Sequence, residues 1–226
     1  MLASLDAVTK RYGRNEGVRD LSVGFPAGEI TGVLGLNGSG KTTLLKLLAG
    51  LLHPTRGIVR VFDGVPRLQR GRLVYLGEND ALWHWMTPDD ASRFMQGLYA
   101  DFDAARMAQL LKLLEVPHRR TKAMSKGERG RLRLAMALAR SAKLYLLDEP
   151  LAGIDLLSRE KIIRSLVSEW HTDETILLST HEVAEAEGLF DRVLLLRSGQ
   201  LALDTRAEVL RETGKSVVDA FREVLG

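Results

Sequence analysis

Residues 35–42 are Gly-Leu-Asn-Gly-Ser-Gly-Lys-Thr, which fits the pattern G-x-x-x-x-G-K-[ST]. The apolar run Ile30–Leu34 precedes this stretch, and the helical pattern Thr42–Leu52 follows it. Glycines let the backbone curl so that successive N–H groups point into one concavity. Such a concavity beside a helix N-terminus attracts phosphate oxygens. The stretch therefore predicts a phosphate-binding loop between a buried strand and a helix.

The side chains of this loop have distinct expected roles. Lys41 supplies a positive charge for β- and γ-phosphates, and Thr42 offers a hydroxyl to Mg²⁺. The alternative is a glycine-rich turn that contains lysine by chance, but it leaves the strand and helix on either side unexplained. The expected phosphate contacts are Asn37, Gly38, Ser39, Gly40, Lys41, Thr42 and Thr43.

A second candidate element is the stretch 144–149, Leu-Tyr-Leu-Leu-Asp-Glu. Its four mostly apolar residues predict a buried strand, and its two carboxylates stand at the C-terminal end, where open α/β sheets bind ligands. Asp148 is suited to hold magnesium through its water shell, and Glu149 to orient or deprotonate an attacking water. An acidic pair by itself is often an ordinary turn. Together with the loop at 35–42 it predicts a P-loop nucleotide-binding protein, a class that includes kinases, GTPases and motor ATPases.

The rest of the chain alternates short apolar runs with longer segments of helical spacing, which predicts an α/β fold with a mainly parallel sheet. The expected strands are Leu2–Val8, Leu21–Phe25, Ile30–Leu34, Ile58–Val61, Leu73–Leu76, Leu144–Leu147, Thr175–Ser179, Val193–Leu196 and Leu201–Leu203. The expected helices are Thr42–Leu52, Pro88–Tyr99, Ala104–Leu114, Glu128–Arg140, Leu156–Trp170, Ala207–Thr213 and Ser216–Leu225.

The alternation stops between Pro88 and Arg140, where helical patterns follow one another without a convincing strand. About fifty residues are too few for a comfortable independent domain. We therefore expect one ATPase domain over 1–226, with an α/β core at about 1–87 and 141–226 and a helical subdomain at about 88–140.

Composition narrows the class of protein. The chain has 226 residues, a net charge of +3 and no cysteine, which excludes a disulfide scaffold and Cys-ligated metal sites. No apolar run approaches the ~18–20 residues that cross a bilayer, and the N-terminus lacks the features of a secretory signal. Interspersed charge and 6% aromatic residues are unlike a nucleic-acid binder. We expect an intracellular globular protein without a nucleic-acid partner.

Residues 124–128, Met-Ser-Lys-Gly-Glu, precede a helical pattern. In order and distance they resemble the LSGGQ signature of the nucleotide-binding subunit of ABC transporters, with Lys126 and Glu128 where that family has Gly and Gln. The family's signature contacts ATP held by the opposite subunit. The resemblance thus implies that Ser125 and Gly127 contact a γ-phosphate across a dimer interface. Ser125 and Glu128 also fit an S-x-x-E capping box, and both roles are compatible.

Three more matches extend this resemblance over the whole chain. Residues 150–155, Pro-Leu-Ala-Gly-Ile-Asp, resemble the D-loop, with Asp155 at the subunit contact; Asp155 fits equally well as the N-cap of the next helix. His181, after a strand, resembles the switch histidine that senses the γ-phosphate. Tyr12 matches the aromatic residue that stacks on adenine, with packing at a strand end as its alternative.

Glu78 departs from the family pattern. Most ABC cassettes have Gln after the strand matched here by Leu73–Leu76, and that Gln reaches Mg²⁺ and the attacking water. A carboxylate can also ligate a hard cation, but it adds negative charge near the γ-phosphate, which is expected to slow hydrolysis. The resemblance implies magnesium at Thr42, Glu78 and Asp148, and catalysis by Glu149, His181 and Glu78.

Residues 81–86, Ala-Leu-Trp-His-Trp-Met, hold two of the three tryptophans. In ABC transporters this region faces the membrane subunit, and an aromatic, Met-containing loop suits that contact. The alternative is that these side chains attach the helical lobe to the core. Lys126 and the tract Leu98–Asp103 resemble short cassettes of the antibiotic-export or ABC-2 type.

As a whole, the resemblance implies an ATP-binding and ATP-hydrolysing subunit that powers a separate membrane permease, an exporter. Its fold would be a P-loop NTPase core with N-terminal antiparallel strands and an inserted helical lobe. ATP and Mg²⁺ are the expected cofactors, in a head-to-tail sandwich formed by a homodimer or with a related cassette. We expect it in the cytoplasm, on the inner face of the cell membrane. The alternative is a soluble ABC-type ATPase that acts on ribosomes or nucleic acid.

Overall fold

The computed structural model describes residues 1–78, 82–155, 159, 162–163 and 174–225. It divides into two compact units, and one of the places where the chain passes from one unit to the other lies between the consecutive residues Asp148 and Glu149. Unit 1 comprises Met1–Tyr75, Lys143–Asp148 and His171–Gly226, and unit 2 comprises Leu76–Ala142 and Glu149–Trp170. The helix predicted over 156–170 falls mostly outside the described residues. The division into a core and a helical subdomain at 88–140 stays a prediction.

Unit 1 is built on two sheets. In spatial order, the first sheet has the antiparallel strands β2 (Asn15–Phe25), β1 (Ala3–Tyr12) and β4 (Arg56–Val61). The second has β5 (Leu73–Leu76), β6 (Leu144–Asp148), β7 (Thr175–Thr180), β3 (Ile30–Leu34), β8 (Arg192–Arg197) and β9 (Gln200–Arg206). Strands β6, β7, β3 and β8 are parallel, and β9 is antiparallel to β8. The predicted α/β fold with a mainly parallel sheet and N-terminal antiparallel strands is confirmed.

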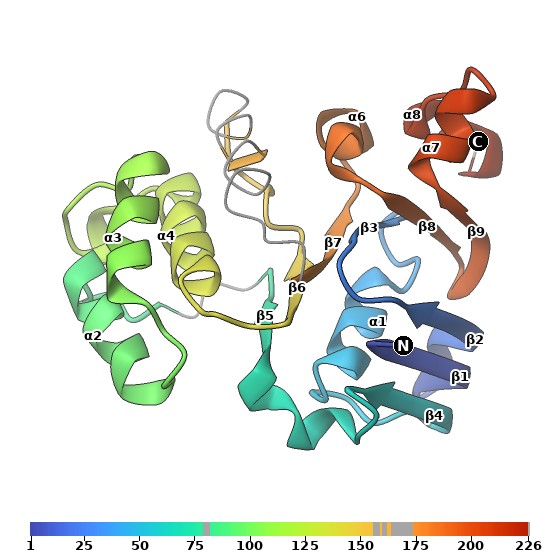
Figure 1. Ribbon diagram of the computed structural model, residues 1–226, viewed down its shortest axis with the longest axis horizontal. Coiled ribbons are helices and arrows are strands. Elements are labelled where there is room, and N and C mark those ends of the chain that lie inside the picture. The colour runs from blue at the N-terminus through green and yellow to red at the C-terminus, as the bar shows by residue number, and fades with distance from the viewer. Residues whose placement is uncertain (79–81, 156–158, 160–161, 164–173, 226) are drawn as a thin grey trace. The chain divides into compact units, whose positions relative to one another are not determined.

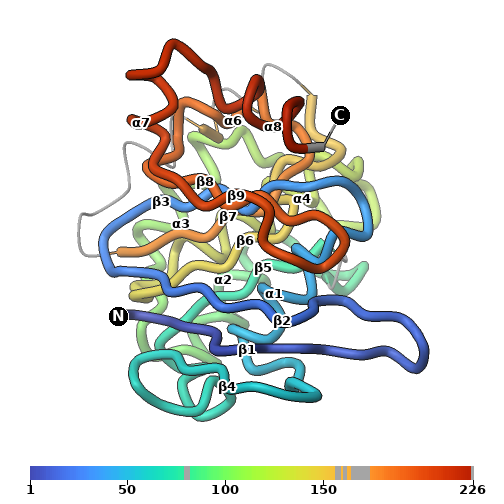
Figure 2. Tube along the Cα trace, turned by 90° about the vertical axis from the view of Figure 1, so that its right-hand side faces the viewer, coloured from blue at the N-terminus to red at the C-terminus, as the bar shows by residue number. Residues whose placement is uncertain are grey.

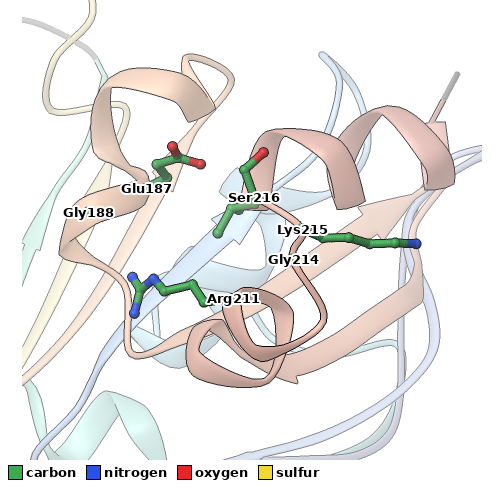
Figure 3. Close-up of a pocket in the computed structure, with 7 residues that line it drawn as sticks. Glu187, Gly188, Arg211, Gly214, Lys215 and Ser216 are labelled. Carbon is green, nitrogen blue, oxygen red and sulfur yellow. The ribbon is translucent and has the colours of Figure 1, made fainter.

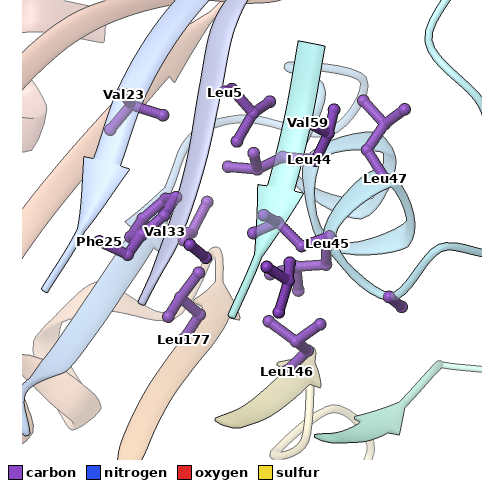
Figure 4. Packing of buried hydrophobic residues seen from close by; sticks show 14 of the residues in the cluster. Leu5, Val23, Phe25, Val33, Leu44, Leu45, Leu47, Val59, Leu146 and Leu177 are labelled. Carbon is purple, nitrogen blue, oxygen red and sulfur yellow. The ribbon is translucent and has the colours of Figure 1, made fainter. Parts of the chain in front are cut away.

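Burial explains this arrangement. Every residue of β3, β6 and β7 is buried, as expected for parallel strands covered on both faces. Helix α1 (Lys41–Leu48) lies between the strands of the second sheet and those of the first in Figure 2. Its leucines 44, 45, 47 and 48 join side chains of both sheets, such as Val59 and Leu146, in one apolar cluster (Figure 4).

Several predicted boundaries were wrong by a few residues. Strand β1 ends at Tyr12, later than predicted, and strand β2 begins at Asn15, earlier than predicted. The reason is that polar residues continue the backbone hydrogen-bond ladder to the end of this hairpin. Helix α1 ends at Leu48, before Gly50 turns at φ 67°. A Cβ at Gly50 would lie 2.4 Å from the backbone nitrogen of Arg67, so this turn requires glycine.

Unit 2 contains α2 (Pro88–Leu98), α3 (Ala104–Leu113) and α4 (Lys126–Leu138), which pack together in Figure 1. Each begins at a side-chain cap: Thr87, Asp103 and Ser125 accept hydrogen bonds from amides of the first turn, which satisfies donors that the helix leaves unpaired. Helix α4 starts at Lys126 instead of the predicted Glu128 because Ser125 is the cap. The short helix η3 (Thr121–Ala123) precedes it.

The remaining helices of unit 1 are short. They are η1 (Pro66–Leu68), η2 (Arg70–Arg72), α6 (Val183–Ala186), η4 (Glu187–Leu189), α7 (Ala207–Glu212) and α8 (Val217–Leu225). Val217 and Ala220 of α8 are buried, so the C-terminal helix docks as predicted. Among the described residues, none of the helices has the length and apolar character needed to span a membrane.

Candidate functional site

Three parallel strands of unit 1 end at the same edge of the second sheet. Strand β3 leads into the glycine-rich loop, β6 ends at Asp148, and β7 ends at Thr180. In the ladder Leu34 is opposite Thr180 and Asp148 is opposite Ser179. The loop and Asp148, which lie more than a hundred residues apart in sequence, therefore meet where open α/β sheets bind ligands.

The loop has a backbone that only glycine accepts at two positions. Gly35 and Gly40 have φ 153° and 106°. A Cβ on Gly40 would lie 2.4 Å from the carbonyl oxygen of Gly17, and one on Gly35 would lie 2.5 Å from that of Leu196. The tight curl predicted from the sequence is thus present, and neighbouring backbone prevents larger residues from entering it.

Lys41 and Ser39 lie inside this curl. The buried Lys41 ammonium donates to the carbonyl oxygens of Gly35, at 2.8 Å, and Leu36, at 3.3 Å. The Ser39 hydroxyl oxygen is buried and has no hydrogen-bond partner among the described residues. A buried hydroxyl without a partner is costly, and a phosphate oxygen bound in the curl would satisfy it. These residues fit a nucleotide phosphate group.

Asp148 is held by three hydroxyl groups. It is 1% exposed, and its Oδ1 accepts hydrogen bonds from Thr42 Oγ1, at 3.0 Å, and Ser179 Oγ, at 2.7 Å. Its Oδ2 accepts from the Tyr75 hydroxyl, at 3.3 Å. Thr42 and Asp148 present the hard oxygen donors that magnesium prefers, so they fit a Mg²⁺ ion bound with a nucleotide.

Sequence analysis missed two of these hydroxyls. Ser179 lies two residues before His181, near the end of a buried strand. A polar serine in an otherwise buried position could have been recognised from the sequence as a candidate site residue. Tyr75 lies inside an apolar strand and carries no such signal, since only the sheet order places β5 next to β6.

Tyr12 lies beside the start of α1. Its hydroxyl is 3.4 Å from Thr43 Oγ1, and the missing side chain of Gly17 makes room for its ring, since a Cβ there would be 2.8 Å from Tyr12 Cε2. The side chain is 46% exposed, and the ammonium of Lys10 lies 5.5 Å from the ring centroid. Tyr12 is thus near the phosphate loop; stacking on adenine stays a prediction.

His181 is exposed in the bend that follows β7. The preceding Thr180 hydroxyl accepts a hydrogen bond from the Glu182 amide, at 2.9 Å, which shapes this bend. His181 therefore lies at the same edge of the sheet as Asp148. The sequence predicted that His181 follows this strand, and it does. Its role toward the γ-phosphate stays a prediction.

In unit 2, the sequence 124–128 forms the start of α4. Ser125 Oγ accepts from the Glu128 amide, at 3.2 Å, and Glu128 Oε2 accepts from the Ser125 amide, at 2.7 Å. Arg119 donates to both carboxylate oxygens of Glu128, at 2.8 and 2.7 Å. These contacts, first Arg119 and then Ser125, lower the pKa of Glu128. The capping box is confirmed, and Arg119 is a partner that sequence analysis missed.

The same helix contacts the stretch 150–155. A Cβ on Gly127 would lie 3.1 Å from the Gly153 carbonyl oxygen, so glycine at 127 lets that backbone approach. The Asp155 carboxylate is 3.7 Å from Arg131 NH1, and its carbonyl oxygen accepts from the Arg159 amide, at 2.9 Å. Ser125, Gly127 and Asp155, predicted to contact a second subunit, thus belong to one local structure.

Glu149 is a non-glycine residue in the left-handed region, at φ 50°. Such a conformation is strained, and strain of this kind is concentrated at functional sites. Its carbonyl oxygen accepts from the Ala152 amide, at 3.1 Å, which closes the turn after β6. Ala7 and Ser198, among others, share this conformation, so the catalytic role of Glu149 stays a prediction.

Glu78 is exposed just after β5. Arg133 of α4 donates to the carbonyl oxygens of Glu78, at 3.2 Å, and of Gly77. Sequence analysis noted neither contact. The next residues, 79–81, lie outside the described chain, so the predicted aromatic loop is described only from Leu82.

The aromatic loop divides into an anchored part and an exposed part. Met86 is buried, and its carbonyl oxygen accepts from the Thr121 amide, at 2.8 Å. Trp83 and Trp85 are 49% and 58% exposed and stack at 6.0 Å, while Trp83 meets Phe94 edge to face at 4.9 Å. Met86 packs within unit 2, and the two tryptophans leave an aromatic surface.

Figure 3 shows a pocket of ≈ 410 Å³ elsewhere in unit 1, between the segment after His181 and the C-terminal helices. Its lining includes Glu187, Arg211 and Ser216. The lining shares no residue with the glycine-rich loop or with the residues around Asp148.

The family model described as ABC transporter matches residues 18–152. This range includes the glycine-rich loop, residues 124–128, and the carboxylates of Asp148 and Glu149. The chain belongs to the ABC transporter family. The predicted ATP-binding cassette is therefore confirmed, and the chain is of the ATPase class.

Curated relatives of this ABC protein agree with the assignment. The uncharacterized ABC transporter ATP-binding protein YxlF of Bacillus subtilis (strain 168) is 30% identical over 217 residues, which are 93% of this chain and 73% of YxlF. The aliphatic sulfonates import ATP-binding protein SsuB of Escherichia coli (strain K12) is 36% identical over 214 residues, covering 92% of this chain and 82% of SsuB. The antibiotic-export or ABC-2 subfamily has no support among these relatives.

Solved structures share the fold of this ABC cassette. An ATP-binding subunit of an ABC transporter has a TM-score of 0.86 at 24% identity and covers 99% of both chains. The dimeric cassette MJ0796, bound to ADP and Pi, has a TM-score of 0.79 at 22% identity, covering 90% of this chain and 98% of that one. At these identities the likeness supports the P-loop NTPase fold.

Proposed function

We propose that this chain binds MgATP at the sheet edge of unit 1, hydrolyses it, and so powers a separate membrane permease. The observation that carries the proposal is the meeting of Thr42 with Asp148 beside the glycine-rich loop. A hydroxyl and a carboxylate at the end of parallel strands, next to a lysine in a phosphate-binding curl, suit a nucleotide with its magnesium ion.

Each residue of unit 1 has a distinct role in this proposal. Lys41 leaves its carbonyl partners in the loop and donates to β- and γ-phosphate oxygens, and the Ser39 hydroxyl gains the partner that it lacks. Thr42 and Asp148 hold Mg²⁺, which neutralises phosphate charge when bound. Tyr12, next to α1, stacks on adenine; a flat ring recognises any base weakly.

Glu149, His181 and Glu78 are the proposed catalytic residues. Glu149 accepts a proton from the attacking water or orients that water. His181 donates a hydrogen bond to the γ-phosphate and so distinguishes ATP from ADP. Glu78 contributes an oxygen to Mg²⁺ and to the attacking water.

The proposed active assembly is a head-to-tail dimer with two ATP molecules, either two copies of this chain or one copy and a related cassette. Ser125 and Gly127 would contact the γ-phosphate bound by the partner, and Asp155 would lie at the subunit contact. The joint packing of these residues around α4 supports a common role. The MJ0796 cassette, whose fold is similar, is dimeric in two solved structures.

The Glu149→Gln variant tests this proposal. It keeps the size of the side chain but removes the base, so we expect ATP turnover to fall at least about 100-fold while ATP binding persists. In MgATP the variant should become dimeric in light scattering after size exclusion. Lys41→Ala is the control that should not bind nucleotide productively. A Glu149→Gln protein that stays monomeric in saturating MgATP would contradict the sandwich.

The proposed membrane partner is a permease on whose cytoplasmic face the chain sits. The exposed Trp83 and Trp85 support an interaction surface in unit 2, because exposed aromatic clusters mark protein contacts. Export, expected from Lys126 and residues 98–103, has no support from the sulfonate relatives, which are named as import proteins.

Affinity capture from detergent-solubilised source membranes tests the permease. We expect a stoichiometric multi-spanning membrane protein with the wild type, and much less of it with a Trp83→Ala/Trp85→Ala variant. The identity of that protein narrows the substrate class. Capture of ribosomal proteins or DNA-repair factors instead would favour the alternative ABC ATPase that acts on ribosomes or nucleic acid.

A further inference from the structure

Arg133 of α4 reaches the backbone that carries Glu78. Its two terminal nitrogens donate to two consecutive carbonyl oxygens, NH1 to Glu78, at 3.2 Å, and NH2 to Gly77. All these residues belong to unit 2. The contact therefore joins the middle of α4 to the segment that leaves β5.

A guanidinium fork restricts this segment more than a single donor could. Its donors have a fixed planar geometry, so binding two successive carbonyl groups fixes the orientation of both peptide planes. The orientation of these planes sets the direction in which the Cα–Cβ bond of Glu78 leaves the backbone. Gly77 and Glu78 lie beyond the last residue of β5, where the sheet ladder no longer holds the backbone.

A second arginine of α4, Arg131, contacts another segment of unit 2. It lies two residues before Arg133 and contacts Asp155 instead. Residues i and i+2 of a helix point to different sides. One helix thus contacts the segment of Glu78 on one side and the stretch that ends at Asp155 on another.

We propose that Arg133 is a positioning residue for Glu78: it orients the Gly77–Glu78 backbone, so that Glu78 serves in hydrolysis. The inference rests on the role of Glu78 in the proposed ATPase function.

The first test needs no nucleotide and therefore does not depend on that function. Hydrogen–deuterium exchange of the whole chain is compared between wild type and Arg133→Met, which keeps the length of the side chain without the fork. We expect exchange in the peptide that contains Gly77 and Glu78 to rise at least about fivefold. Arg93→Met is the matched control, since Arg93 contacts Asp90 at the exposed surface of the same unit; it should leave that peptide unchanged.

The second test separates kcat from KM for ATP. For Arg133→Met we expect kcat to fall about tenfold, because misplacement of a catalytic group by about 1 Å can cost up to ~100-fold, with KM changed less than twofold. Arg133→Lys keeps the charge but not the planar fork, so its kcat should lie between that of the wild type and that of Arg133→Met. It also provides a folded variant if Arg133→Met does not fold. In a Glu78→Gln background, Arg133→Met should lower kcat by a smaller factor.

Two outcomes overturn the proposal. One is exchange at Gly77–Glu78 that stays within twofold of wild type in both Arg133 variants. The other is raised exchange with an unchanged kcat, which would make Arg133 only a structural contact. Absence of ATP turnover in the wild-type protein would instead refute the proposed function, while the exchange experiment would still test the contact.

Discussion

Among single residues, Asp148 shows how the site of unit 1 depends on buried hydrogen bonds. A carboxylate that is 1% exposed loses its hydration, and a buried charge is tolerated only when hydrogen bonds replace the water. Thr42, Ser179 and Tyr75 replace it here. The same hydroxyls keep the carboxylate in place for the magnesium ion that we propose.

Ser179→Ala should therefore destabilise the protein. The bond from Ser179 to Asp148 is short, at 2.7 Å, and hydrogen bonds to charged groups contribute about 1.5–3 kcal/mol. We expect a loss of that size in the free energy of unfolding, measured by urea titration without nucleotide. Tyr75→Phe removes a longer bond, at 3.3 Å, and should cost less. An equal or reversed order of the two variants would show that other contacts hold Asp148.

The loop glycines permit a second matched comparison. Gly38 and Gly40 both have positive φ, 80° and 106°, so an alanine is strained at either position by about 1–2 kcal/mol. A Cβ at Gly38 meets nothing within 4 Å, whereas at Gly40 it meets the Gly17 carbonyl oxygen at 2.4 Å. Gly40→Ala should lower the urea midpoint clearly more than Gly38→Ala. Equal midpoints would mean that the Gly17 strand yields without cost.

Among the secondary-structure elements, helix α4 carries or contacts several of the proposed site residues. Its N-terminus carries Ser125 and Gly127, its cap depends on Glu128, and its arginines contact the segments of Glu78 and Asp155. The sequence predicts a capped helix here, but the partners of its charged side chains lie on other segments. A change in the stability of α4 therefore affects several proposed site residues at once.

The ionisation of Glu128 makes this helix sensitive to acid. Contacts with Arg119 and Ser125 hold the pKa of Glu128 below its ordinary value of 4.5. A lowered folded pKa stabilises the protein above the unfolded pKa, and this stabilisation is lost as pH falls through the folded value. The carboxylate is mostly covered, and an ion pair of this kind contributes up to about 1 kcal/mol.

Glu128→Gln tests this pH dependence. An amide still completes the capping box, so the variant should lose only the charge and be less stable than wild type by up to about 1 kcal/mol at pH 7. The difference in the free energy of unfolding should shrink as pH falls below about 4.5. Urea titrations from pH 7 to pH 3 would measure it. A difference that stays constant over this range would contradict the assignment to Glu128.

For the whole molecule, the boundary between the units separates the proposed site residues. Lys41, Thr42 and Asp148 belong to unit 1, whereas Glu78 and Ser125 belong to unit 2. In a head-to-tail dimer, each ATP needs the loop of one chain and Ser125 of the other. Two defective chains should therefore complement each other.

Mixing two variants in the Glu149→Gln background tests this arrangement. Lys41→Ala removes the phosphate contact, and Ser125→Asp keeps a helix cap but adds a negative charge opposite the γ-phosphate. Each variant alone should stay monomeric in MgATP. The mixture should form dimers that retain one ATP per dimer, as measured by light scattering and nucleotide content. A mixture that stays monomeric would exclude the head-to-tail contact through Ser125.

Local motifs were predictable because their chemistry is contained in neighbouring residues. A glycine-rich loop with Lys41 and Thr42, a strand that ends in Asp148, and the cap at Ser125 each need only short-range sequence. Family membership followed from the order of these motifs, and the family model confirmed it. The export direction had no such basis, since it is a property of the permease and not of the cassette.

The amino-acid sequence alone sufficed for the fold class, the phosphate-binding loop and the ATPase class of this ABC protein, because apolar periodicity and motif spacing are encoded along the chain. Tertiary structure decided which distant side chains support these motifs: Ser179 and Tyr75 at Asp148, Arg119 at Glu128, and Arg133 at Glu78. Sheet order and helix packing create such contacts between segments far apart in the sequence, and no local pattern specifies them.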